Sequence, residues 1–137
     1  MEDQARTTAT WRSLATAYLA AQAALGVIWW GLLAASPTVR SWFELLPHRH
    51  GALDSFLLAD LAVFIGGSAA SALAVWTVSR WAVTATSFTA GGLVYATLCL
   101  LAWVAFEGSA AAGVAPMVVA SAVTGAIAIR LRAEEGR

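Results

Sequence analysis

The sequence predicts an all-α integral membrane protein in which four transmembrane helices form an antiparallel bundle. Of its 137 residues, 60% are hydrophobic and only 12% are charged, whereas soluble domains usually carry about 25% charged residues. The mean hydropathy is +0.73. The few charges leave four long gaps, and each gap provides the ~20 apolar residues that a helix needs to cross about 30 Å of hydrocarbon.

These gaps place the four spans at about 13–35, 53–77, 81–106 and 109–130, within a single domain that covers residues 1–137. Helices are expected rather than strands, because lipid leaves no backbone group unpaired and because the runs lack the alternation of barrel strands. The first apolar run exceeds the roughly 7–15 residues of a signal-peptide core. We therefore expect it to remain as a span.

The link between the first two spans has a pattern of its own. Ser36 and Pro37 are typical of a helix start, with a capping hydroxyl followed by proline at the first helical position. The apolar residues that follow recur at helical spacing: Val39, Trp42, Phe43 and Leu46. We predict a short amphipathic helix over 37–46 that lies in the outer membrane interface. The alternative is a plain loop whose aromatic side chains anchor it at the headgroups.

The arginines indicate the orientation. Four spans place both termini on one side of the membrane, together with the link between spans two and three. The arginines on that side are Arg6, Arg12, Arg80, Arg130, Arg132 and Arg137, against Arg40 and Arg49 on the other. The positive-inside rule then predicts a multi-pass protein of the cell (inner) membrane with both termini in the cytoplasm.

Asp60 is the only charged residue in the stretch 55–79. It lies seven residues after Leu53, which places it roughly 10 Å below the outer end of the second span. Apart from one phenylalanine, the residues on its helical face are small or carry hydroxyls: Phe64, Gly67, Ser68 and Ser71. Because such a face packs closely against other helices, Asp60 is expected to point into the protein.

Asp60 supports a functional and a structural interpretation. In the functional one it is the acid, base or polar anchor of a pocket in the outer leaflet, and Tyr95 is its hydrogen-bond partner, so that the two form a candidate catalytic pair. In the structural one it bonds to Tyr95 or to the backbone of the first span and only fixes the helix register. Gln22, near the middle of the first span, is expected to form an interhelical hydrogen bond.

The pocket would be lined by residues that share the depth of Asp60 or lie at its mouth. These candidate ligand-binding residues are Trp29, Trp30, Cys99, Trp103, Glu107, His50 and Asp54. Four packed helices would bring them into one amphiphilic layer beneath a polar rim. Packing is the alternative role of the tryptophans, because tryptophans are common at both ends of membrane spans.

Metal and cofactor signals are weak. His48, His50 and Asp54 have ligand chemistry, but an HxH pair in a loop has little specificity and the helix dipole already explains Asp54. The lone Cys99 excludes an internal disulfide and a cysteine-cluster metal site. The sequence lacks a phosphate-binding glycine loop, a nucleophile elbow and an HExxH motif. We therefore predict no metal and no cofactor.

Two functional hypotheses follow. The first is a small inner-membrane protein that binds a lipophilic small molecule or membrane lipid around Asp60; processing of that molecule, and so enzyme activity, is left open. The alternative is a non-catalytic accessory subunit that forms homo-oligomers or docks on a larger membrane enzyme or transporter through the small-residue runs 66–72 and 109–115 and Gly125. The net charge of 0 argues against a nucleic-acid partner.

Overall fold

The computed structural model describes residues 2–44, 53–108 and 110–136. Every regular element in these ranges is a helix, and four stretches are long and apolar enough to cross a membrane. These candidate spans are Ala9–Ala35, Asp54–Trp76, Ala82–Glu107 and Ala111–Glu135. The all-helical class and the four long apolar helices are thus confirmed.

The second span is composite, whereas the other three are nearly continuous α-helices. In chain order the elements are α1 (Glu2–Ala35), α2 (Pro37–Ser41), η1 (Asp54–Phe56), α3 (Leu57–Ala59), η2 (Asp60–Gly66), α4 (Gly67–Trp76), α5 (Ala82–Glu107), η3 (Ala111–Gly113) and α6 (Val114–Glu135). The elements η1 and η3 are 3₁₀-helical, and η2 is π-helical.

The link helix α2 begins as predicted and ends sooner. The Ser36 hydroxyl accepts a hydrogen bond from the Val39 N–H at 3.3 Å, and Pro37 occupies the first turn. The helix ends at Ser41 and a turn follows at Trp42, so the predicted extent of 37–46 is too long. The remainder of the link, residues 45–52 with His50, lies outside the described residues.

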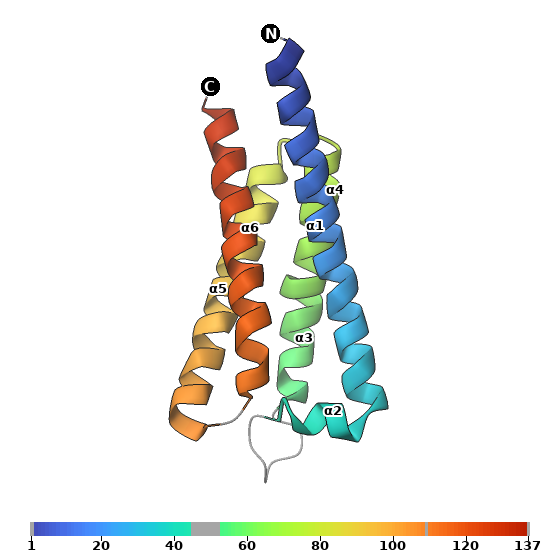
Figure 1. Cartoon of the computed structure of the whole chain (residues 1–137), viewed down its shortest axis with the longest axis vertical. Coiled ribbons are helices and arrows are strands. Elements are labelled where there is room, and N and C mark those ends of the chain that lie inside the picture. Colours follow the sequence, from blue (N-terminus) through green and yellow to red (C-terminus); the bar gives the residue numbers. More distant parts are fainter. Residues whose placement is uncertain (1, 45–52, 109, 137) are drawn as a thin grey trace.

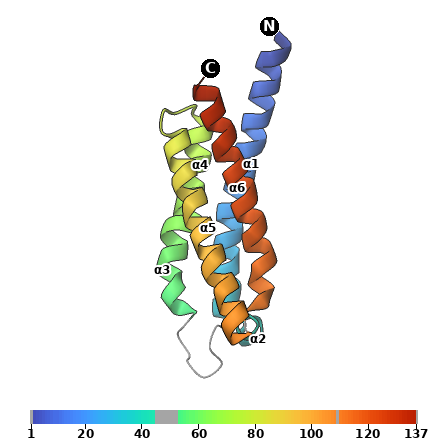
Figure 2. The same cartoon turned by 90° about the vertical axis from the view of Figure 1, so that its left-hand side faces the viewer.

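The long helices pack in the order of the chain. The second span contacts α1 on one side and α5 on the other, α5 contacts α6 most extensively, and α6 meets α1 along a smaller contact. Both chain termini lie at one end of the bundle and α2 lies at the opposite end (Figures 1 and 2).

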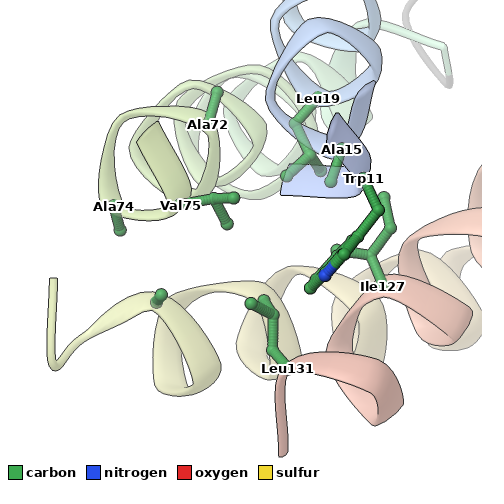
Figure 3. Packing of buried hydrophobic residues seen from close by; sticks show 9 residues of the cluster. Trp11, Ala15, Leu19, Ala72, Ala74, Val75, Ile127 and Leu131 are labelled. Carbon is green, nitrogen blue, oxygen red and sulfur yellow. The ribbon is translucent and has the colours of Figure 1, made fainter. Parts of the chain in front are cut away.

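The apolar core lies at the end that carries the termini. Trp11 and Leu19 of α1, Val75 of α4 and Leu131 of α6 come together there, and Leu19 is fully buried (Figure 3). A polar clamp closes the same end, because the Trp11 indole donates to Glu134 Oε1 at 2.6 Å and Arg12 Nη2 donates to Glu134 Oε2 at 2.8 Å. This clamp joins the first and last helices.

The middle of the bundle is rich in buried hydroxyl and amide groups. The Gln22 amide nitrogen donates to Ser68 Oγ at 2.8 Å, and its amide oxygen accepts from Thr124 Oγ1 at 3.2 Å. Further interhelical pairs are Ser71 with Thr89 and Thr97 with Ser121, at 3.1 and 2.7 Å. The expected bond of Gln22 is confirmed, and neutral groups link all four long helices in the interior of the bundle.

Candidate functional site

Asp60 opens a π-helical segment in the second span. Within η2 the backbone bonds reach back five residues, as from the Gly67 N–H to the Ala62 carbonyl. Gly66 suits this wide turn, since a Cβ there would lie 2.9 Å from the Leu61 carbonyl oxygen. π-Helical turns are rare and frequently accompany functional sites. This turn was not predicted from the sequence.

Trp30 of α1 is the hydrogen-bond partner of Asp60. Its Nε1–H donates to Asp60 Oδ2 at 3.1 Å, and both side chains are half-buried. Asp60 lies six residues after Asp54, the first residue of the candidate span, which is about 9 Å along the helix axis. The bond therefore ties α1 to the second span inside the apolar stretch, and Trp30 contributes a donor group rather than only an apolar wall.

Tyr95 is not the hydrogen-bond partner of Asp60 among the described residues; Trp30 occupies the position expected for it. The Tyr95 side chain is 72% exposed, whereas Leu93 is 1% exposed. Two residues turn an α-helix by about 200°, so Tyr95 lies on the side of α5 opposite to the buried Leu93. The second span instead meets α5 through small residues, because a Cβ at Gly92 would collide with Val63 and one at Gly67 would lie 2.7 Å from Thr89 Oγ1.

Trp29 takes part in a different contact from Trp30. Its ring meets that of Phe43 edge to face, with centroids 4.0 Å apart. Phe43 follows α2 and also lies close to Gly113 at the start of the last span, 3.8 Å from the position of a Cβ there. Adjacent helical residues point about 100° apart. Trp29 therefore packs against Phe43, whereas Trp30 forms the hydrogen bond to Asp60.

The other predicted site residues are dispersed. Cys99 and Trp103 are half-buried in α5, and Glu107 is exposed at its end. Asp54 forms an ion pair of 2.7 Å with Arg40, and its hydrogen bond raises the pKa of the Arg40 guanidinium. Among the described residues, no hydrogen bond or ion pair joins these side chains to Asp60, and no three His, Cys, Asp or Glu side chains cluster as metal ligands would.

A groove lies elsewhere, on the outer surface between α5 and α6. Its volume is about 260 Å³, and its lining residues are Val94, Thr97, Leu98, Val118, Ser121 and Ala122. The two hydroxyls in this lining bond to each other, so the groove offers an apolar surface. None of the predicted site residues lines it. The small residues of α6 were the sequence feature that could have indicated this groove, but the sequence does not tell which face of the helix they share.

Comparison with family models gives no match, and neither a curated protein nor a solved structure matches the chain. Within the described residues, the site with the most distinctive chemistry is the Asp60–Trp30 pair. It places an acid inside an apolar span, and the acid accepts a hydrogen bond at one oxygen from a donor on another helix. This pair has the polar groups to bind a ligand. Tyr95, the second member of the predicted catalytic pair, lies instead on the exposed side of α5.

Proposed function

We propose that this protein crosses the cell (inner) membrane four times as an antiparallel bundle, with both termini in the cytoplasm, and binds a lipid or another lipophilic molecule in the outer leaflet at Asp60 and Trp30. The six-to-two distribution of arginines supports the orientation. Trp42, 61% exposed just after α2, supports an interfacial position for that helix.

The observation that carries the binding proposal is the incomplete pairing of Asp60. Trp30 satisfies Oδ2, and no other side chain of the described residues is hydrogen-bonded to the carboxyl group. Elsewhere in the middle of the bundle, neutral groups join the helices, as Gln22 does with Ser68 and Thr124. Helix packing alone therefore does not call for an acid here. Its cost inside a membrane is offset if the free oxygen binds a ligand.

Binding rather than turnover is the function that this geometry supports best. The candidate catalytic pair needed Tyr95 beside the carboxyl group, and Tyr95 lies on the outer surface of α5. Trp30, which takes the place of Tyr95, is a hydrogen-bond donor with no acid–base role near neutral pH. The pair is thus suited to holding the polar end of an otherwise apolar molecule.

Native mass spectrometry of the protein extracted from membranes tests this proposal. The wild type should carry a lipophilic molecule that Asp60→Leu loses while it keeps its circular-dichroism melting profile. Glu135→Leu is the control, because it removes an exposed acid at the other end of the bundle. Trp30→Phe provides a second test if Asp60→Leu fails to fold. A ligand-free wild type, or full retention by a folded Asp60→Leu, contradicts the proposal.

A specific observation also favours the accessory-subunit alternative. A Cβ at Gly125 of α6 would meet no atom within 4 Å, and the neighbouring Ala122 and Ala126 are exposed. Such small residues allow close helix–helix association in membranes. Gly67 does not serve this purpose, since it packs on Thr89 of the same chain.

The alternative predicts an oligomer or a complex that Gly125→Leu disrupts, as measured by cross-linking in native membranes. Gly91→Leu is the matched control, because Gly91 lies on α5 with equally open space. A wild type that is not cross-linked to itself or to another protein would exclude this function.

A further inference from the structure

We infer that Asp60 is a neutral carboxylic acid that donates a hydrogen bond from Oδ1 to an acceptor oxygen of an uncharged lipophilic molecule, such as a ketone, ester or alcohol. This inference rests on the proposed function and assigns its ligand class. It follows from the donor on Oδ2, from the positions of the cations and from the depth of the carboxyl group.

The indole of Trp30 determines which oxygen is available. An indole N–H only donates, so Oδ2 must be an acceptor in this bond. The carbonyl oxygen of a protonated carboxyl group is the better acceptor, so the hydrogen is expected on Oδ1, to which no other side chain of the described residues is hydrogen-bonded. The pair would offer a ligand one hydrogen-bond donor, the O–H of Asp60. The bond from Trp30 of α1 would fix the orientation of this carboxyl group.

The chain provides no cation within its apolar stretches that would keep this acid ionised. Lysine and arginine are absent between residues 13 and 39, 50 and 79, and 81 and 129. At the same end of the bundle, Arg40 is already paired with Asp54 at 2.7 Å, and Arg49 lies outside the described residues. An unpaired carboxylate in hydrocarbon is costly, so the carboxyl group is expected to bind a proton instead.

The depth of Asp60 restricts the ligand to uncharged polar groups. The span Asp54–Trp76 has 23 residues, about 34 Å of helix against roughly 30 Å of hydrocarbon. A carboxyl group about 9 Å along this helix would lie several ångströms inside the hydrocarbon. Charged headgroups remain outside that region, so a binding partner should present its acceptor oxygen on an apolar body.

The surface beside the pair suits such a body. Val27, one turn before Trp30, is 58% exposed, and Leu61, next to Asp60, is 45% exposed. Gly31 is exposed too, and a Cβ there would meet no atom within 4 Å. The exposed neighbours of the pair in the chain are therefore apolar or small, and the carboxyl oxygen is the polar feature.

The experiment compares methyl undecyl ketone with dodecylamine as probes in phosphatidylcholine nanodiscs. The ketone carries an isotope label at its carbonyl carbon, and infrared spectroscopy reports the hydrogen bond as a lowered carbonyl frequency. The wild type should show this shifted band and should bind the ketone about five-fold or more tightly than Asp60→Leu, because one hydrogen bond is lost. It should also show a protonated-carboxyl band at neutral pH that is absent from Asp60→Leu and from Asp60→Asn.

Asp60→Asn separates the ligand class from the existence of the site. Asparagine can accept from Trp30 through its oxygen and donate to the ketone through its amide nitrogen, so ketone binding should persist. The inference is overturned if the protonated-carboxyl band is absent, or if dodecylamine binds the wild type and is lost from a folded Asp60→Asn. If neither probe distinguishes the wild type from Asp60→Leu, the proposed site itself is wrong.

Discussion

Gln22 of α1 and Thr124 of α6 share a hydrogen bond of 3.2 Å although 102 residues separate them in the chain. The same glutamine donates to Ser68 at 2.8 Å, so one amide joins three of the long helices. Gln22 is 5% exposed and its two partners are fully buried. These bonds satisfy polar groups that burial removes from water.

Gln22→Leu should therefore destabilise the bundle. The substitution removes both bonds and leaves two buried hydroxyls without this partner, at a cost of about 1–2 kcal/mol. Thermal unfolding in detergent measures the change. Leu25→Ala is the control and should have little effect, because Leu25 lies on the same helix and is 62% exposed. Equal unfolding profiles for wild type and Gln22→Leu would show that the buried amide has no role in stability.

The clamp at the terminal end should hold α1 against α6. Glu134 accepts from both Trp11 and Arg12, while the Arg130 guanidinium lies 4.5 Å from the centroid of the Trp11 ring. Glu134→Ala removes all the carboxylate bonds and should cost about 1 kcal/mol, since the ion pair is only partly exposed.

Spin labels at the ends of α1 and α6 should report a broader distance distribution in Glu134→Ala. The neighbouring Glu135→Ala should leave this distribution unchanged, because Glu135 is exposed. Glu134→Gln should have an intermediate effect, since it keeps an acceptor for the indole but not the charge. An unaltered distribution in Glu134→Ala would mean that packing alone holds these ends.

Gly91 and Gly92 provide a matched pair in α5. A Cβ at Gly92 would collide with Val63, whereas one at Gly91 would meet no atom within 4 Å. Gly92→Val should destabilise the bundle by about 1–3 kcal/mol through overpacking, and Gly91→Val should not. Both variants have the same change in helix propensity, so the difference between their unfolding temperatures isolates the contact. Similar temperatures would contradict the close approach of the second span and α5.

The π-helical turn should depend on Gly66. A Cβ at this residue would lie 2.9 Å from the Leu61 carbonyl oxygen, so Gly66→Ala should shift the segment and move Asp60 relative to Trp30. Nuclear magnetic resonance of protein with nitrogen-labelled tryptophan measures this displacement through the Trp30 indole signal, which Trp30→Phe identifies. Gly125→Ala, in open space, should leave the signal in place. An unmoved signal in Gly66→Ala would show that the turn does not position the pair.

Much of the architecture follows from the sequence because charge is so unevenly distributed along the chain. The gaps between charges predict four long apolar helices, and they single out Asp60 as an acid within one of them. Gln22 was likewise predictable as an interhelical donor, since a polar amide in the middle of such a helix needs a protein partner. These inferences need only the position of a residue along a helix.

Which side chains meet was decided by the tertiary structure. Asp60 bonds to Trp30 rather than Tyr95, the two neighbouring tryptophans serve separate contacts, and a π-helical turn begins at the acid. A span that is apolar on all sides carries no stripe that marks its inward face. The rotation of α5, which turns Tyr95 outward, is instead set by close contacts such as that of Gly92 with Val63, and those contacts exist only once the helices have packed.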